Sequence, residues 1–342
     1  MVPFAGYDMP VQYKGVIHEC LAVRNGTGIF DVSHMARLTF TGDRVLEFLE
    51  KITSNDVSKL EDNRGQYSLL PNLDGGIVDD IIVYRITENE YRMVVNASNH
   101  EKDVAWLTQQ NTFGVTITDT TDESAMIAVQ GPKAGALVAG LSGQKAILED
   151  LPFFGVYEGE IAGVQCFAPR SGYTGEDGFE LICKAGDAMK LWNALVEAGA
   201  EPCGLGSRDA LRVEAGLPLY GHELNDELSP IVAGLGWVVS KTKQFNGCDQ
   251  IRAVQTAGPA RRVVGIKLGS KRLPQIGMDV VVDQKIVGQV CSGVYSPLLE
   301  CGIAFAVVDS GVPLKTACAL DMRGKLEDGT IVNKRFFKRS EG

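Results

Sequence analysis

The feature that most limits how this chain can fold is an order of predicted elements that occurs twice. Each copy reads as a strand, a helix, a pair of strands and a second helix, identified by the spacing of apolar residues. The first copy is predicted over 36–40, 45–52, 81–96 and 98–107, and the second over 126–129, 133–141, 164–183 and 189–196. Such a unit forms a small antiparallel sheet backed by helices. We therefore predict an α+β fold with a duplicated strand-helix-hairpin-helix unit.

Two of the predicted helices begin at serine residues that are typical of helix N-caps. Ser98 is followed three residues later by Glu101, which is the spacing of a capping box. Ser207 precedes a helix that continues toward Leu217, and we expect its hydroxyl to cap that helix.

The chain beyond Asn246 differs from both copies, because strand patterns follow one another without a long helix. These strands are predicted over 263–268, 279–282, 286–291, 303–308, 317–322 and 330–337. Short strands joined by hairpins are typical of a small β-barrel or sandwich. The basic run Lys334–Arg339 near its end is expected to be a solvated face.

The composition argues against several classes of function. The 342 residues carry a formal net charge of −10 and a pI near 5.0, which does not suit a nucleic-acid binder. No apolar run approaches the length of a bilayer span, so no membrane segment is expected. The 8 cysteines include no C-x-x-C pair and the 4 histidines no H-x₃-H spacing, so no metal site is predicted. Scattered thiols are expected to be reduced, in the cytoplasm or an organelle matrix.

The segment Asp74–Tyr84 begins with a Gly-Gly turn and places two adjacent carboxylates, Asp79 and Asp80, in an apolar, β-branched run. Neighbours on a strand point to opposite faces, so the two carboxylates cannot have the same role. One is expected to face water or cap the turn, whereas the other needs a partner or a task on the strand's inner face. The alternative is a hairpin whose aspartates only satisfy turn amides.

Two loops of the second half contain the other unusual residues. The loop Ser171–Glu180 combines three glycines with an aromatic residue and carboxylates, but it lacks the G-K-[ST] of a phosphate-binding loop. Its backbone would let a flat ligand approach closely. Arg208 lies in the first turn of a helix, where the helix dipole disfavours a cation. We expect Arg208 to meet an anion, either an acidic side chain or a ligand carboxylate.

Several blocks of residues, taken in order, resemble the aminomethyltransferase (T-protein) family of the glycine cleavage system. They are Phe4–Pro10, Phe30–Met35, Gly75–Asp80, Val95–Ala97, Ala128–Pro132, Gly172–Glu180, Gly204–Asp209 and Leu217–Gly221. The resemblance covers nearly the whole chain and implies three domains arranged as a cloverleaf around a central folate site. The domains implied are 1–35 with 121–240, then 36–120, and a C-terminal β-barrel-like domain over 246–342.

The resemblance implies an enzyme that takes an aminomethyl group from the lipoyl arm of a partner, the H-protein. It would pass the methylene to tetrahydrofolate, giving 5,10-methylenetetrahydrofolate, ammonia and dihydrolipoyl H-protein. By motif position, Asp80 is the catalytic carboxylate beside the folate nitrogens, Glu180 accepts hydrogen bonds from the pterin, and Arg208 meets a ligand anion. The other residues implied to bind folate are Met35, Tyr67, Tyr84, Asn96 and Tyr173. Core packing is the alternative for Met35 and Tyr84.

The sequence also departs from the family pattern. Members usually begin some residues before Met1, so the first element is expected to be incomplete or the true start to lie upstream. Ser207 stands where Ala is common. The segments 296–301 and 334–337 differ from the Ser-Pro-Thr-Leu-Gly and Lys-Pro-Phe-Tyr patterns, which puts the contacts of the third domain in question rather than the folate site.

Two other functions in the same superfamily stay open. A folate-binding iron–sulfur maintenance protein would carry a Lys-Gly-Cys-Tyr-x-Gly-Gln block, of which Phe245–Gln250 keeps only Gly-Cys. A demethylase of small methylated substrates would use the same folate. We expect a monomer that binds lipoylated H-protein and folate, without nucleic acid, membrane or metal. Its expected location is the cytoplasm, or the mitochondrial matrix if the source is eukaryotic.

Overall fold

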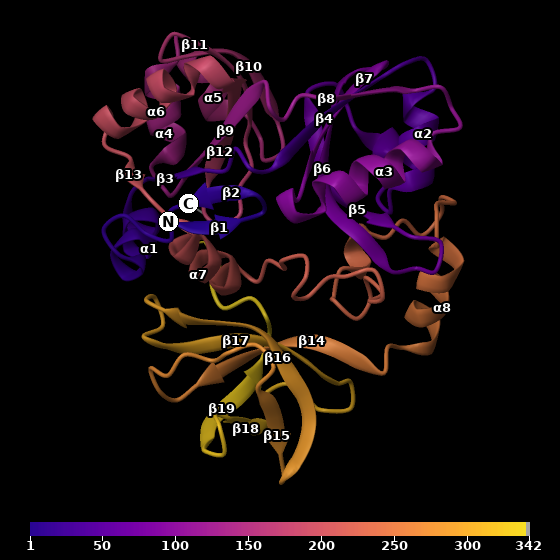
Figure 1. Ribbon diagram of the computed structural model, residues 1–342, viewed down its shortest axis with the longest axis vertical. Helices are drawn as coiled ribbons and strands as arrows, with labels where there is room; N and C mark the ends of the chain where they lie inside the picture. Colours follow the sequence, from indigo (N-terminus) through magenta and orange to yellow (C-terminus); the bar gives the residue numbers. More distant parts are fainter. Residues whose placement is uncertain (340–342) are drawn as a thin grey trace.

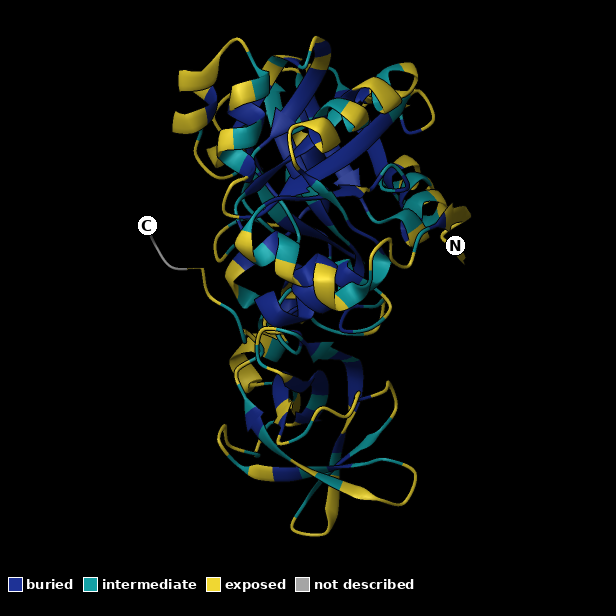
Figure 2. Cartoon of the chain, turned by 90° about the vertical axis from the view of Figure 1, so that its left-hand side faces the viewer, coloured by how far each residue is buried: buried dark blue, intermediate teal, exposed yellow. Residues whose placement is uncertain are grey.

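Two α+β lobes lie side by side above a β-barrel in the computed structural model, which describes residues 1–339 (Figure 1). The predicted α+β class is confirmed. The chain begins with a hairpin of β1 (Val2–Phe4) and β2 (Tyr7–Met9) and with helix α1 (Val16–Asn25). Buried residues concentrate on the strands, whereas exposed residues lie on the outer helices and the barrel loops (Figure 2). Among the described residues, no helix is long and apolar enough to cross a membrane.

The first predicted unit forms a five-stranded antiparallel sheet with the strand order β5-β6-β7-β4-β8. Its strands are β4 (Ala36–Thr41), β5 (Arg64–Pro71), β6 (Ile77–Thr87), β7 (Glu90–Val95) and β8 (Thr116–Asp119). Its helices are α2 (Val45–Ile52) and α3 (His100–Gln110), with the short turns η1 (Val57–Lys59) and η2 (Ala97–Asn99). Phe48 of α2 and Leu107 of α3 pack with Phe40 and Val83 in one buried cluster, so both helices cover this sheet.

The second unit forms a six-stranded sheet with the order β10-β11-β12-β9-β3-β13. Its strands are β3 (Gly28–Asp31), β9 (Ser124–Gln130), β10 (Val156–Ile161), β11 (Val164–Pro169), β12 (Gly178–Lys184) and β13 (Glu201–Pro202). Its helical elements are α4 (Ala134–Leu141), α5 (Lys145–Asp150), η3 (Ala185–Asp187) and α6 (Ala188–Glu197). The order β10-β11-β12-β9 repeats β5-β6-β7-β4, so the duplication is visible in the sheets.

The sequence analysis missed β5 and β10, the first strands of the two units' three-stranded meanders. Each carries an internal glycine, Gly65 in β5 and Gly159 in β10, among polar residues that interrupt the apolar alternation. The tertiary structure overrides this weak local signal, because each strand pairs along most of its length with the next one.

The C-terminal region contains a closed barrel with the strand order β14-β17-β16-β15-β18-β19. Its strands are β14 (Arg261–Leu268), β15 (Asp279–Val282), β16 (Lys285–Ser296), β17 (Cys301–Asp309), β18 (Ala317–Asp321) and β19 (Leu326–Val332). Each predicted strand overlaps an observed one, although 330–337 coincides with β19 only over residues 330–332. As expected, no long helix interrupts these strands, but the unpredicted helix α8 (Cys248–Ala257) precedes the barrel and packs against the Gly75 turn of the first lobe. The domain boundaries stay a prediction.

The basic run at the end of the barrel is solvated in part: Arg335, Lys338 and Arg339 are exposed, as predicted, whereas Lys334 and the two phenylalanines pack onto the rest of the molecule. Strand β19 ends at Val332, whereas the prediction extended it to Phe337. The backbone amides of Phe336 and Phe337 then donate to the Glu214 carbonyl at 3.0 and 2.7 Å. Lys334 Nζ donates to the Ala233 carbonyl at 2.7 Å. The ring of Phe336 stacks on Phe305 of β17 with centroids 6.2 Å apart, so the segment joins the barrel to α7.

Helix α7 (Leu205–Ala215) lies at the centre, between the two lobes and the barrel (Figure 1). Its N-cap residue is Gly204, so the expectation that Ser207 caps it is wrong. Glu19 of α1 takes over this role: its Oε2 accepts the Gly204 amide at 2.9 Å and the Ser207 hydroxyl at 3.0 Å. At the other end, buried Arg212 donates to Ser292 of the barrel at 2.7 Å. Helix α7 is therefore bonded to the second lobe and to the barrel.

The predicted capping box of α3 is also absent. The helix begins at His100 rather than Ser98, and the side chain of its N-cap residue, Asn99, makes no capping bond. Asn99 instead donates to Asp79 at 2.5 Å. A tertiary partner has therefore replaced the local one.

Candidate functional site

Asp80 on β6 is held by side chains from both neighbouring strands. The Tyr67 hydroxyl on β5 donates to Asp80 Oδ2 at 2.9 Å, and Asn96 Nδ2, directly after β7, donates to Oδ1 at 2.8 Å. Because β5 and β7 flank β6 in the sheet, the strand order brings these three predicted site residues together. Burial and the charge of Asp79 raise the pKa of Asp80 to about 7. A carboxyl group with such a pKa can exchange a proton at neutral pH.

Asp79 is fully buried, which corrects the expectation that one of the two carboxylates faces water or caps the Gly-Gly turn. Its Oδ2 accepts the Asn96 amide at 2.9 Å, and its Oδ1 accepts Asn96 Nδ2 at 2.9 Å and Asn99 Nδ2 at 2.5 Å. Asp79 thus caps the η2 turn after β7. The physical reason is that helix α3, which follows η2, places its own buried Asp103 against Asp79.

Glu180 on β12 belongs to a chain of hydroxyl groups that joins the second lobe to Tyr84 on β6 of the first lobe. The Ser171 hydroxyl donates to Glu180 Oε2 at 2.5 Å, and the Tyr84 hydroxyl donates to Ser171 Oγ at 3.4 Å. Within residues 1–339, the other oxygen, Oε1, receives no hydrogen bond from the protein. Burial raises the pKa of Glu180. Tyr84 is wholly buried, and its ring lies edge-on to the Phe167 ring with the ring centroids 5.5 Å apart. Its hydroxyl therefore holds Ser171 from within the core.

Arg208 on α7 is a cation without a carboxylate partner. Among the described residues, its guanidinium makes no hydrogen bond or ion pair, and it lies over the Tyr173 ring with Cζ 4.8 Å from the ring centroid. Burial lowers the pKa of Arg208, and Tyr173 and Glu180 oppose this shift. The Tyr173 hydroxyl is occupied by the Pro218 carbonyl, so its ring is the part that faces the cation. A partly buried charge that the described chain leaves unpaired suits an anionic ligand.

The remaining predicted residue, Met35, lies between β3 and β4 and packs against a core cluster that includes Val32 and Tyr84. The sequence analysis missed Trp237 on η4 (Gly236–Val238), which is 71% exposed and stacks on Tyr67 with ring centroids 5.8 Å apart. The sequence offered one signal for Trp237, namely an aromatic residue in a glycine-containing segment outside the predicted helices and strands. Its exposure and its contact with Tyr67 depend on the tertiary structure.

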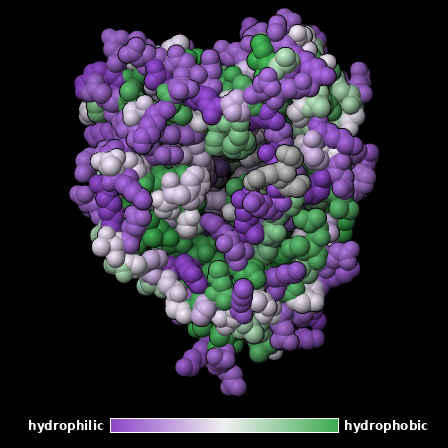
Figure 3. Space-filling view, turned by 180° about the vertical axis from the view of Figure 1, so that it is seen from behind, coloured by the Kyte–Doolittle hydropathy of each residue, from purple (hydrophilic) through white to green (hydrophobic). Residues whose placement is uncertain are grey.

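These groups come from three parts of the molecule: Asp80 from the first lobe, Glu180 from the second and Arg208 from α7. They lie within electrostatic reach of one another, because Glu180 acts on Arg208, and Asp80 together with burial raises the pKa of Tyr173. Seen from behind, the molecule is hollowed near its middle, in the part formed by the two lobes (Figure 3). Within residues 1–339, no group of three His, Cys, Asp or Glu side chains is arranged to hold a metal ion.

The fold and the site together define a class of protein with two α+β lobes and a C-terminal barrel, whose candidate site combines a carboxyl group of raised pKa with a cation that no carboxylate of the described chain pairs. Two family models match the chain: the GCVT N-terminal domain over residues 1–243 and the glycine cleavage T-protein C-terminal barrel domain over 261–338. The chain therefore belongs to the glycine cleavage T-protein family.

Individual relatives agree with this assignment. The chain is 44% identical to an aminomethyltransferase of Exiguobacterium sibiricum over 100% of this chain and 94% of the relative. It is 39% identical to the aminomethyltransferase of Bacillus subtilis over 99% of this chain and 95% of the relative. The crystal structure of the glycine cleavage system aminomethyltransferase T from Bartonella henselae matches with a TM-score of 0.91 and 32% identity, over 98% of this chain and 94% of that one. The predicted aminomethyltransferase function is confirmed, and neither alternative function is favoured.

Proposed function

We propose that this chain transfers the methylene of an aminomethyl group from lipoylated H-protein to tetrahydrofolate, releasing ammonia and dihydrolipoyl H-protein. The observation that carries the proposal is Asp80, a carboxyl group with a pKa near neutrality, held between Tyr67 and Asn96. When bound, tetrahydrofolate supplies the two nitrogens that take up the carbon. The family to which the chain belongs supports both this folate and the H-protein partner.

The residues around Asp80 fit a folate. Glu180 Oε1 is available to accept hydrogen bonds from the pterin N–H groups, because Ser171 occupies only the other oxygen. Arg208 offers a positive charge to a ligand anion, since no carboxylate of the described chain pairs with it. The rings of Tyr173 and the exposed Trp237 offer apolar faces to a flat ligand.

In this proposal, Asp80 orients the folate nitrogens and accepts a proton as the carbon is transferred. Tyr67 and Asn96 fix the carboxylate by one hydrogen bond to each oxygen, so its direction is set before the substrates arrive. A group that must be ionised to accept a proton loses this ability as the pH falls through its pKa. We therefore expect kcat/KM to fall as the pH decreases below about 7.

The decisive experiment measures ammonia release from aminomethyl-loaded H-protein in the presence of tetrahydrofolate. Omission of either H-protein or folate gives the controls. Release that requires both substrates supports the proposal. Folate binding without ammonia release would indicate a folate-binding protein, and turnover of methylated amines without H-protein would indicate a demethylase. We propose that the chain acts as a monomer, in the cytoplasm or the mitochondrial matrix, which sedimentation and fractionation of the native source would test.

A further inference from the structure

The buried carboxyl group of Asp103 has no place in the proposed reaction so far. Asp103 lies on α3 and is 0% exposed. Neither of its oxygens receives a hydrogen bond from an N–H or O–H donor among the described residues. Asp103 nevertheless lies one helical turn after Asn99, the N-cap residue of α3 whose side chain donates to Asp79 at 2.5 Å, and the charge of Asp79 contributes to a raised pKa of Asp103. A buried carboxylate in such surroundings is strongly destabilised unless it is neutral.

The hydrogen bonds of Asp79 show which member of the pair holds the proton. Three N–H groups, two from Asn96 and one from Asn99, already point at the Asp79 oxygens, and N–H donors favour the ionised form. No N–H group of the described chain points at Asp103. Two adjacent buried carboxyl groups are satisfied together only when one carries a proton. The proton therefore belongs on Asp103, whose O–H donates to the Asp79 carboxylate.

This assignment connects α3 to the reacting carboxylate through a continuous line of hydrogen bonds. Asp103 donates to Asp79, Asp79 accepts both the backbone and the side-chain N–H of Asn96, and the same side-chain nitrogen donates to Asp80 at 2.8 Å. The negative charge that remains on Asp79 faces Asp80 and favours its protonation. Each residue along these hydrogen bonds therefore helps to fix either the position or the protonation state of the next one.

We propose that Asp103 is a positioning residue for aminomethyl transfer: it stays protonated, donates to Asp79, and so keeps one fixed negative charge and an oriented Asn96 behind Asp80. The proposal rests on the role of Asp80 given under the proposed function. It extends that role, because the proton affinity of Asp80 is then controlled by the buried pair Asp79 and Asp103 on the opposite face of the strand.

Within residues 1–339, no other titratable group around Asp79 and Asp103 takes over the part of the proton on Asp103. Lys102, the neighbouring cation on α3, instead donates to the Tyr220 hydroxyl at 2.5 Å and to Asp226 at 3.2 Å. Tyr67 from β5, Tyr173 from the β11–β12 loop and Tyr220 after α7 also face the carboxyl groups, and burial raises the pKa of all three phenols. They are neutral at working pH. Burial, followed by the charge of Asp79, raises the pKa of Asp103, in agreement with the geometry.

The test compares the pH dependence of kcat/KM for ammonia release in the parent, Asp103→Asn and Asp79→Asn. Asp103→Asn retains an N–H donor and, like the protonated acid, carries no charge. The decrease of kcat/KM at low pH should therefore occur at the same pH as in the parent. Asp79→Asn removes the charge facing Asp80, so that fall should move down by about one pH unit. Movement in Asp103→Asn but not in Asp79→Asn would overturn the proposal, because the charge would then lie on Asp103.

A second pair of measurements separates positioning from general stability. Asp103→Leu loses the donor, and we expect kcat to fall ~10–10²-fold while Asp103→Asn restores it. Carbon-13 NMR of labelled aspartate should detect one carboxyl group still protonated at about pH 9, absent from Asp103→Asn. That spectrum needs no substrate and remains informative if Asp103→Leu does not fold. A spectrum with every aspartate ionised would refute the inference alone, whereas an absence of ammonia release by the parent with both H-protein and tetrahydrofolate present would refute the proposed function.

Discussion

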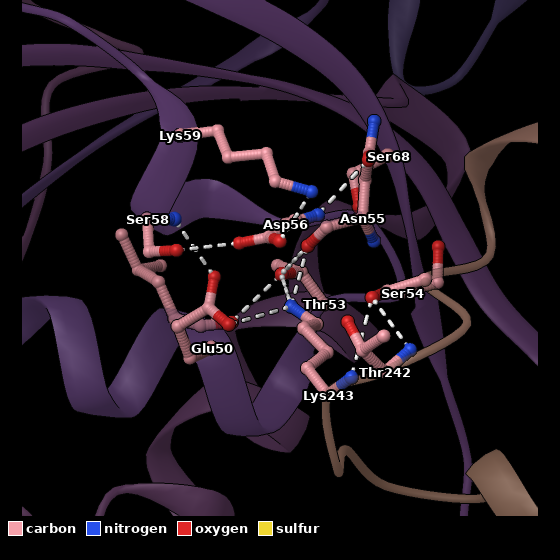
Figure 4. Close-up of polar contacts among 12 residues, drawn as sticks. Glu50, Thr53, Ser54, Asn55, Asp56, Ser58, Lys59, Ser68, Thr242 and Lys243 are labelled. Carbon is pink, nitrogen blue, oxygen red and sulfur yellow. Dashed lines mark hydrogen bonds and ion pairs between the residues drawn. The ribbon is translucent and has the colours of Figure 1, made fainter.

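Two partly buried cations, Lys243 and Arg208, show how differently the chain treats a charge that it uses for structure and one that it leaves for a ligand. Lys243 is surrounded by acceptors near the C-terminal end of α2 (Figure 4). Its Nζ donates to Thr53 Oγ1 at 3.2 Å and to the Asn55 carbonyl, and it pairs with Glu50 at 3.4 Å. Arg208 has only the Tyr173 ring. The first charge is satisfied within the chain and the second is not.

The comparison teaches that burial alone does not identify a functional residue. Burial lowers the pKa of Lys243 to about 8 and also lowers that of Arg208, so the two cannot be told apart by that effect. What separates them is the partner. The acceptors of Lys243 tie the segment after η4 to the first lobe, a structural task, whereas an unpaired guanidinium beside Glu180 and Tyr173 is costly unless a ligand meets it.

Substitution of Asp80, the candidate catalytic carboxylate, should have the largest effect. Asp80→Asn keeps the shape and one acceptor, but it cannot take a proton. We expect turnover to fall ~10²–10⁴-fold, with folate affinity within a few-fold of the parent and an unchanged melting temperature. Ammonia release and calorimetric folate binding measure the two quantities. Near-parental turnover would remove Asp80 from the reaction.

Arg208→Met should sharpen the comparison by removing the unpaired charge itself. Because the partner of Arg208 is expected to be a ligand anion, folate affinity should fall by ~2–4 kcal/mol. The parental affinity should also depend on salt more steeply than that of the variant. Titration at several salt concentrations provides the measurement. Intact affinity with a lowered melting temperature would instead make Arg208 a structural residue like Lys243.

Glu180→Gln tests the acceptor on the other side of the site. One carboxylate oxygen becomes an N–H donor that would face the ligand's own N–H groups. We expect folate affinity to fall by ~1.5–3 kcal/mol without loss of the fold. The conservative variant Glu180→Asp, which retains the charge but not the reach, is the matched control. Unchanged affinity by calorimetry would exclude Glu180 from the site.

Lys243→Met should have the smallest effect on function, because its partners lie within the chain. We expect folate affinity and turnover to stay parental while the free energy of unfolding falls by ~1–3 kcal/mol at neutral pH. The pKa of Lys243 is lower in the folded state, about 8 against an ordinary 10.5, so the unfolded chain binds more protons between these values. The parent should therefore gain stability relative to the variant as the pH rises through this window. A loss of folate affinity would break the comparison.

The sequence alone determined much of the architecture and most of the candidate site. Apart from strands such as β5 and β10, the elements of both units follow from apolar spacing over a few residues, and the barrel strands follow from repeated short hairpins. The resemblance to the T-protein family selected Asp80 and Glu180 by motif position, whereas the local setting marked the Asp79–Asp80 pair in an apolar strand, the glycine-rich loop Ser171–Glu180 and the cation Arg208 in a first helical turn. Local signals suffice for such residues, because the conflict that marks them is itself local.

Only the tertiary structure decided how these residues are supported. The burial of Asp79 depends on α3 covering β6, the replacement of Ser207 by Glu19 at the start of α7 depends on α1, and the stacking of Trp237 depends on β5. Each partner is distant in the sequence, so no pattern within a short window records it. The roles of Asp103 and Lys243 belong to the same class. Whether a buried charge is structural or functional depends on which groups the tertiary structure brings next to it, and the order of residues along the chain does not contain that information.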